Sequence, residues 1–358
     1  MASRLPFQLA PYTDELLSAF LVRSAHAHGI NAHRFCRVYL PPAITVWTRD
    51  IDCTARLELL QEVSNAWGFD IGRAYEMILQ TPPPISVNAS VAEREACFSQ
   101  WVNAVGVYHR SRTRFGLQYC PQCLSDRPTY VRAWRYSFVT VCPVHYCALL
   151  DRCRSCGSPV VPHRSFLLTR CHHCGAFLSG SRARLPYIEF EKKLAIQDFF
   201  TRAMYGESME IGTLVVPASD FLAGALAILG NIKEKLYSYP ALIPLPVDFV
   251  ARTPPLRLAS CADRARWMIV LASVLEEWPS RFLALADSCA MSQVGFSRYR
   301  VPGWLGSVIA QLPSRTRSRC GWSRGTLNAR IRRIEEAGGH GCRAERATVL
   351  FDAAQDRR

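Results

Sequence analysis

The chain has 358 residues, a mass of 40.3 kDa and 49% apolar residues, which is enough for two or three compact units with buried cores. Its formal net charge of +14 makes a polyanion the first partner to consider. The start shows no signal-peptide pattern, and the most apolar run, Phe221 to Gly230, is about half the length of a membrane span. We therefore expect a cytoplasmic protein that does not insert into a membrane.

The first helix of the chain is expected directly after residues 13–15. Thr13, Asp14 and Glu15 have the composition of a helix start, and Gly29 fits as the stop. One apolar stripe lies between these signals; it consists of Leu16, Leu17, Phe20 and Leu21.

Two further helices are expected before a proline-rich break that ends at residue 84. One runs from about Thr54 to Trp67, with Asp52 as its cap and Gly68 as its end, and the next runs from Ile71 to Leu79 after the cap residue Asp70. In the former, the side chains expected to face the core are Leu57, Leu60 and Val63. The two helices are compatible with a helix-turn-helix, but few of their exposed positions are basic, which favours an ordinary helical hairpin.

Four metal-ligand pairs follow one another in the middle of the sequence, as C-P-Q-C, C-P-V-H, C-R-S-C and C-H-H-C. Two residues between paired ligands form a tight turn that directs both side chains at one metal. Fifteen cysteines in a chain without an export signal favour a reducing compartment, where thiolates bind metal. We therefore predict two structural Zn²⁺ ions, with the ligands Cys120, Cys123, Cys142, His145, Cys153, Cys156, Cys171 and Cys174.

The simplest pairing of these ligands follows chain order. It gives one site with three cysteines and a histidine, and a second with four cysteines. A crossed pairing, in which the first and third pairs share an ion, stays open. Cys147 and His163 are spare donors, and the local geometry disfavours His172 and His173 as ligands to the ion bound by their own pair.

Catalysis is the competing interpretation of the metal sites. A catalytic zinc keeps one coordination position for water, whereas the predicted ligands fill both sites. The sequence has no H-E-x-x-H, no phosphate-binding G-x-x-x-x-G-K-S/T, no G-x-S-x-G and no deaminase H-x-E motif. We therefore expect a protein that is not an enzyme.

Helical patterns resume after a short basic connector. They cover about Ile188–Tyr205, Ala218–Leu229 and Ala262–Trp278, and Pro279 ends the last. One face of the last helix carries Trp267, Val270, Leu271, Val274 and Trp278.

The final stretch is rich in arginine. Between Ser297 and Ile334 there are nine arginines and no acidic residue, with aromatic residues among them. An uncompensated block of this length favours a phosphate or an acidic protein partner over a merely solvated surface. The expected DNA-binding residues are Arg315, Arg317, Arg319, Arg324, Arg330, Arg332 and Arg333.

Three stretches carry a resemblance to a known family. They are LPFQLAPYTDELLSAFLVRSAHAHG near the start, RDID at Arg49 to Asp52, and the zinc segment from YCPQC to CHHCG. Together they resemble the TniQ family, the target-selection proteins of transposons, over roughly the first half of the chain. The resemblance implies an adaptor that reads a target, as DNA or through an RNA-guided complex, and recruits a AAA+ ATPase regulator that brings the transposase.

These observations predict a mainly α fold with small zinc-stabilised knuckle or ribbon modules. We expect an N-terminal helical, helix-turn-helix-like domain over 1–84, a tandem zinc-binding segment over 85–180, a C-terminal helical domain over 181–290 and an arginine-rich region over 291–358. The expected partners are DNA, a AAA+ regulator with its transposase and, in some systems, an RNA-guided complex; homodimerisation stays open. The alternative function is a zinc-dependent DNA-binding transcription regulator.

Overall fold

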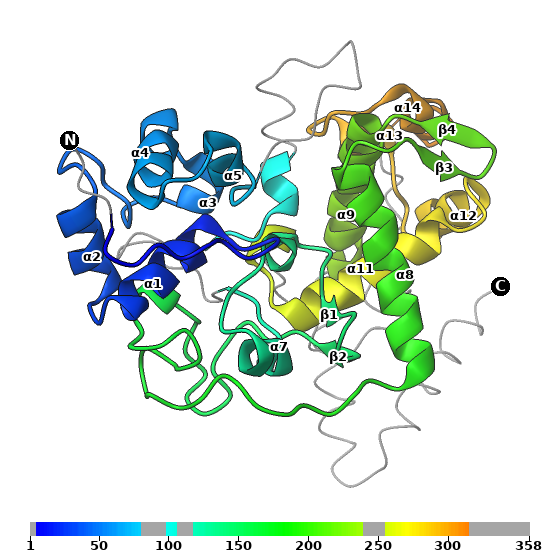
Figure 1. Ribbon diagram of the computed structural model, residues 1–358. Coiled ribbons are helices and arrows are strands. Elements are labelled where there is room, and N and C mark those ends of the chain that lie inside the picture. The colour runs from blue at the N-terminus through cyan, green and yellow to red at the C-terminus, as the bar shows by residue number, and fades with distance from the viewer. Residues whose placement is uncertain (1–4, 80–97, 106–116, 239–254, 315–358) are drawn as a thin grey trace, which may run out of the picture. The chain divides into compact units, whose positions relative to one another are not determined.

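The computed structural model describes residues 5–79, 98–105, 117–238 and 255–314, with residues 236–238 as backbone (Figure 1). The chain divides into two compact units. The first comprises Met1–Ser208, Pro217–Ser219 and Pro254–Ala272, and the second Met209–Val216, Asp220–Thr253 and Ser273–Arg358. Among the described residues, no helix is both long and apolar enough to cross a membrane. The expected division into four segments stays a prediction.

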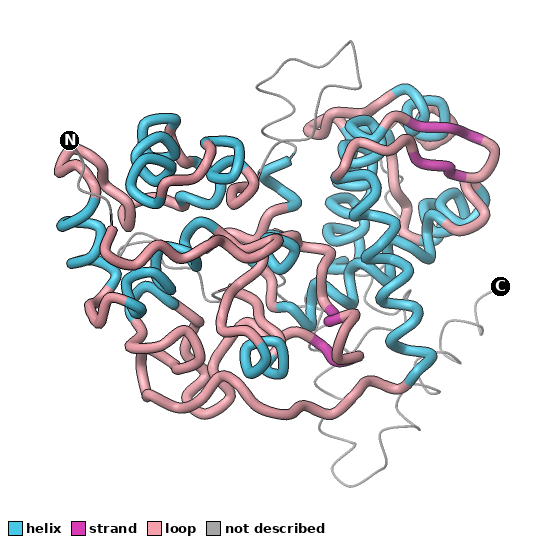
Figure 2. The backbone as a smooth tube through the Cα atoms, viewed as in Figure 1, coloured by secondary structure: helices cyan, strands magenta, loops and turns pink. Residues whose placement is uncertain are grey.

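The first unit is built from short helices and long irregular segments, as Figure 2 shows. Its N-terminal helices are α1 (Leu17–Ala27), α2 (Ala32–Tyr39), α3 (Ile51–Thr54), α4 (Leu57–Trp67) and α5 (Ile71–Tyr75). Its later elements are α7 (Pro121–Asp126), η1 (Arg132–Arg135), β1 (Val141–Cys142), β2 (Cys147–Ala148), η2 (Pro162–Arg164), α8 (Tyr187–Met204) and η4 (Leu256–Leu258).

The start of α1 is capped by a residue distant in sequence, and the expected local cap was wrong. Asp14 has a left-handed backbone, with φ of 60°, and Glu15 is fully buried. The carboxylate of Asp52 instead accepts hydrogen bonds from the amide and hydroxyl of Ser18, both at 2.8 Å. Asp52 therefore satisfies a free amide in the first turn of α1 from 34 positions away. Gly29, with φ of 68°, follows the helix as expected.

The second expected helix is divided in two. Asp52 lies inside α3, and α4 begins only at Leu57, whose side chain is 49% exposed and so does not face the core as expected. The stop was predicted correctly, because Gly68 ends α4 in the left-handed conformation. The next cap was also correct, since the side chain of Asp70 accepts a hydrogen bond from the amide of Gly72.

The geometry of α4 and α5 favours an ordinary helical hairpin over a helix-turn-helix. The two helices pack against each other, but α5 has five residues and rises only about 7.5 Å. It ends before the expected Leu79, whose amide donates to the carbonyl of Asp52. So short a second helix offers little length for reading a DNA groove.

The middle of the first unit is held to α8. β1 and β2 form an antiparallel hairpin in which Cys142 is opposite Cys147. Gln197 on α8 accepts hydrogen bonds from the amides of Thr140 and Val141, at 3.2 and 3.3 Å. These contacts fix the hairpin that carries part of the first metal-binding group.

The second unit contains a hairpin and a set of helices. The hairpin is β3 (Met209–Ile211) paired with β4 (Leu214–Val216), and most of α9 (Ala218–Ser238) belongs to this unit. α11 (Cys261–Leu275) begins in the first unit and ends in the second. The remaining helices are α12 (Ser280–Ser288), α13 (Gln293–Phe296) and α14 (Gly303–Ile309). α8, α9 and α11 correspond to the three helices predicted for this half, although α9 is longer. The expected end of the last helix was wrong: α11 ends at Leu275, and Pro279 instead precedes α12. The apolar residues expected on one face of that helix are all buried, with Trp278 lying beyond its end.

The first part of the arginine-rich stretch has acidic partners and internal aromatic contacts. Arg298 pairs with Glu234, and Arg300 pairs with Asp220 at 3.0 Å, so the expected lack of compensation is wrong for these two arginines. Trp304 donates a hydrogen bond to the carbonyl of Asp220. The other seven arginines, Arg315 to Arg333, lie outside the described residues.

Candidate metal centres

The first group of metal-binding side chains is held by a short helix and a hairpin. Cys120 precedes α7 and Cys123 lies in its first turn, where Pro121 pre-sets the backbone between them. Cys142 ends β1, and His145 lies in the turn that leads to β2. The ligand atoms of these four residues all lie within 4.8 Å of one another.

Distances in this group match a tetrahedral zinc site. Bonds of about 2.3 Å from zinc to sulfur and 2.0 Å to nitrogen separate two sulfurs by about 3.8 Å, and a sulfur from a nitrogen by about 3.5 Å. The Cys123 and Cys142 sulfurs are 3.6 Å apart. His145 Nδ1 is 3.3 Å from the Cys123 sulfur and 3.6 Å from those of Cys120 and Cys142. The donor set therefore fits Zn²⁺ in both chemistry and spacing.

His145 is oriented by a carboxylate on α7. Its Nε2 lies 3.0 Å from Oδ2 of Asp126, while its Nδ1 faces the three sulfurs. A metal on Nδ1 leaves the proton on Nε2, which then donates to the carboxylate. Asp126 thus fixes both the tautomer and the ring plane of His145, a role that the sequence analysis did not assign.

The second group consists of four cysteines on two similar turns. Cys153 and Cys174 are 3.7 Å apart at sulfur, as are Cys156 and Cys171, close to the separation that zinc requires. All four sulfurs lie within 4.8 Å of one another. The grouping follows chain order, so the structure does not adopt the crossed pairing.

Both turns of the second group end in a glycine with a left-handed backbone. The φ angles are 69° at Gly157 and 73° at Gly175, and each glycine amide donates to the carbonyl of the first cysteine of its pair, at 2.9 and 3.0 Å. Tyr146 holds the corresponding position after Cys142, with φ of 56°. Its ring packs on Phe190 of α8 at 5.0 Å, a contact that offsets the strain of a non-glycine residue there.

Cys147 and His163, the spare donors of the sequence, are not part of either group of four ligands. Cys147 is fully buried with its sulfur 3.6 Å from that of Cys120, but it is not among the four donors that lie mutually within 4.8 Å. His163 stacks on Trp47, with ring centroids 4.9 Å apart. The amide of His173 donates to the sulfur of Cys171 at 3.4 Å, which places its backbone beside the site.

The thiols within each group influence one another's ionisation. A hydrogen bond from Cys123 lowers the pKa of Cys120, and the same contact raises the pKa of Cys123. In the second group, hydrogen bonds with Ser158 lower the pKa of Cys156 to about 5. A divalent cation bound in either group would favour ionisation of its thiols.

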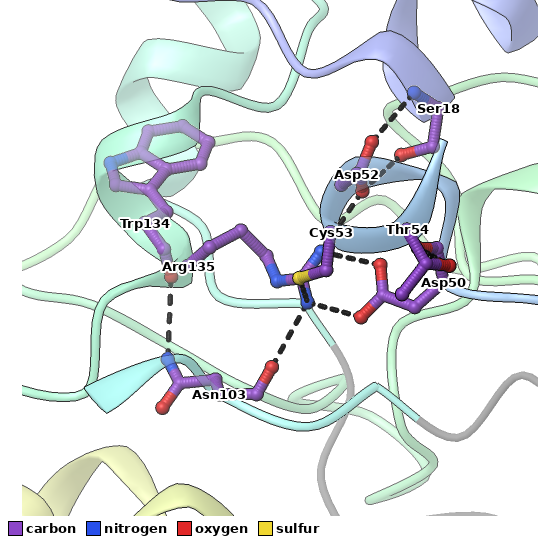
Figure 3. Close-up of polar contacts among 8 residues, drawn as sticks. All are labelled: Ser18, Asp50, Asp52, Cys53, Thr54, Asn103, Trp134 and Arg135. Carbon is purple, nitrogen blue, oxygen red and sulfur yellow. Dashed lines mark hydrogen bonds and ion pairs between the residues drawn. The ribbon is translucent and has the colours of Figure 1, made fainter. Parts of the chain in front are cut away.

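A buried ion network joins the start of α3 to Arg135 in η1 (Figure 3). The Arg135 guanidinium lies between two carboxylates, 3.0 Å from Asp52 and 2.5 Å from Asp50 at its nearest atoms, and it also donates to the carbonyl of Asn103 at 3.0 Å. The side chains of Arg135 and Asp52 are 1% and 3% exposed. RDID was expected to supply a local helix cap, Asp52, and was part of the family resemblance, but no local pattern indicated its ion pair with Arg135, which lies 83 residues from Asp52.

A second buried pair involves other residues from the resembling stretches. Arg23 on α1 bonds both carboxylate oxygens of Glu15, at 2.8 and 2.7 Å, and Thr129 donates to the same carboxylate. Arg132 pairs with Asp14 at 2.9 Å. These charged residues therefore hold the N-terminal helices against the segment that carries the first metal-binding group.

Comparison with known proteins gives one match. Residues 6–149 match the family model described as TniQ. The matched stretch contains both buried ion networks and all four donors of the first metal-binding group, and it ends before the second group begins. A search of curated proteins gives no match to the chain.

Proposed function

We propose that this chain is a TniQ-type transposon target-selection adaptor, because residues 6–149 match the family model described as TniQ and so point to a transposition-associated protein. In this role it binds target DNA or a targeting complex and recruits a AAA+ transposition regulator, which brings the transposase. The observation that carries the proposal is the TniQ match, and the positive net charge of +14 is consistent with a DNA partner.

We further propose that both metal groups bind structural zinc. The support is the donor chemistry, three cysteines with a histidine and four cysteines, together with sulfur separations of 3.6 to 3.7 Å within the groups. Four protein donors complete a tetrahedral shell, so neither site needs water as a ligand. Zinc would then contribute folding free energy to a segment with few regular elements. We infer on the same grounds that the protein acts without catalysis of its own.

The experiment that tests the adaptor role is a reconstituted pulldown. The full chain is immobilised and offered a candidate AAA+ transposition regulator, with and without duplex DNA and ATP. We expect retention of the ATPase, and we expect it to increase when a DNA target is present. A Cys120→Ser variant, which lacks one donor of the first group, serves as the unfolded-module control.

Two results would redirect the interpretation. If the ATPase is not retained under any of these conditions, the adaptor role is wrong. If the gene has no transposase or AAA+ neighbour and the purified chain binds one operator sequence tightly, the transcription-regulator alternative is favoured instead.

A further inference from the structure

We propose that α2 and the loop between the two ligand pairs of the second metal group form a contact surface for duplex DNA. This proposal rests on the proposed function only in taking DNA as a partner. The residues that define this α2–loop surface are Arg34, Arg37, His163, Arg164 and Phe166. All belong to the first unit (Figure 1 shows α2).

Direct contacts join the two parts of the surface. η2 packs against both α1 and α2. The rings of His33 on α2 and His163 in the loop have centroids 5.6 Å apart, and the ring of Trp47 contacts both, at 5.9 Å from His33 and 4.9 Å from His163. His26 on α1 bonds the carbonyl of Ser165 at 3.1 Å. Side chains that lie on separate stretches of sequence are thus held on one surface.

The two stretches of sequence that carry this surface contain basic residues and no acidic ones. Residues 16–49 and 152–188 contain no aspartate or glutamate, and their arginines are Arg23, Arg34, Arg37, Arg49, Arg152, Arg154, Arg164, Arg170, Arg182 and Arg184. Arg34, Arg37 and Arg164 are exposed. Burial, followed by the positive charge of Arg164, lowers the pKa of His33.

The second metal group does not cancel this charge. A zinc ion bound by four thiolates carries a formal charge of about −2. Residues 152–188 contain six of the arginines given above, and one of them, Arg152, pairs with Asp151 at 3.9 Å, so an excess of three positive charges remains. Such a surface attracts a polyanion and repels cationic partners.

An apolar tip projects from the same loop. Phe166 is 93% exposed and Leu167 is 48% exposed. The backbone beneath them is fixed, because the hydroxyl of Ser165 donates to the carbonyl of Arg170 at 2.6 Å and His26 holds the carbonyl of Ser165. A large aromatic side chain held in water beside exposed arginines is the combination found in DNA-contacting wedges, where arginines contact phosphates and the ring contacts sugar or bases.

The test measures DNA binding by the full zinc-loaded chain. Affinity for a labelled random-sequence duplex is followed by fluorescence anisotropy between about 50 and 200 mM salt. The triple variant Arg34→Ala, Arg37→Ala and Arg164→Ala should lower the salt slope by about 2.7, at about 0.9 for each phosphate contact, and weaken binding at least tenfold near about 0.1 M salt. Circular dichroism and zinc content must match those of the unmodified chain.

A second variant tests the apolar tip alone. Phe166→Ala should weaken binding by about fivefold or more and leave the salt slope unchanged, because a stacking or sugar contact releases no counterions. The matched control removes three arginines that already pair with carboxylates: Arg202→Ala, Arg266→Ala and Arg281→Ala. It has the same loss of charge and should keep the slope of the unmodified chain.

Each outcome decides the proposal. It is overturned if the α2–loop triple variant keeps the slope while Arg330→Ala, Arg332→Ala and Arg333→Ala flatten it. It is also overturned if the chain binds no duplex, or if the triple variant loses only the ATPase, which would make the surface a protein-binding one. If the DNA results hold but the ATPase is never retained, the adaptor function fails and the DNA surface stands.

Discussion

Arg135→Met should destabilise the first unit strongly, because it leaves buried carboxylates without a cation. The guanidinium is 1% exposed and contacts Asp52, which is 3% exposed, and Asp50, which is 22% exposed. Breaking a buried ion pair by removing one partner costs about 3–5 kcal/mol. Methionine has a similar length and no charge, so most of the loss comes from the unpaired carboxylates and little from a cavity.

Protonation limits that loss. Burial already raises the pKa of Asp52, while the charge of Arg135 opposes the rise. Without the guanidinium, Asp52 would take up a proton more readily, and each pKa unit of such relief corresponds to about 1.4 kcal/mol. We therefore expect Arg135→Met to lower the free energy of unfolding by about 3 kcal/mol. For a unit of this size, 3 kcal/mol corresponds to a fall of about 6–12 °C in Tm.

The assay is urea unfolding of the zinc-saturated chain, followed by circular dichroism. A double-mutant cycle with Asp52→Asn should return a coupling energy of about 2 kcal/mol. The control is Arg202→Met, which removes an exposed arginine paired with Glu207 and should cost less than about 0.5 kcal/mol. A loss below about 1 kcal/mol for Arg135→Met, or a coupling energy near zero, would refute the role given to this network.

Three further predictions concern the metal groups and the loop. Asp126→Ala should weaken zinc binding by about tenfold in chelator competition, while Asp126→Asn, which keeps an acceptor for His145, should lose less; equal losses would contradict the orienting role. Metal analysis should find two zinc ions in the unmodified chain and one in Cys153→Ser, and a single ion at the outset would exclude two sites. Burial lowers the pKa of His26, so the folded state resists its protonation and its contribution to stability is present above pH 6.5 and lost as pH falls through the folded-state pKa. His26→Gln, whose amide can still donate to Ser165, should therefore show a weaker loss in urea unfolding on acidification, and an unchanged pH profile would count against this assignment.

Some features of the structure followed directly from short stretches of sequence. The metal-ligand pairs, the stop at Gly68 and the cap at Asp70 each depend on residues within five positions of one another. In such cases the backbone conformation of one turn fixes the side-chain geometry. The helices over residues 187–204 and 261–275 were also predictable, since their apolar periodicity repeats over several turns.

Other sequence inferences failed because a distant group competed with a local one. Asp14 and Glu15 have the composition of a helix cap, yet Arg132 and Arg23 draw them into ion pairs, and Asp52 caps α1 instead. Similarly, a charge count could not show that Arg298 and Arg300 have acidic partners on α9. A local cap is worth about 1 kcal/mol at such positions, whereas leaving a buried charge such as Glu15 without its partner costs about 3–5 kcal/mol.

The sequence by itself determined the four ligand pairs, because the turn that gathers each pair is encoded within four or five consecutive residues, whereas the tertiary structure decided which two pairs form each metal group. Only the tertiary structure decided that Asp52 completes α1, that Arg135 bridges two carboxylates, and that α2 meets the loop carrying Phe166. These contacts join residues that are 34 to more than 100 positions apart. They form only when the chain folds back on itself to bury its apolar core, and no local pattern encodes that folding.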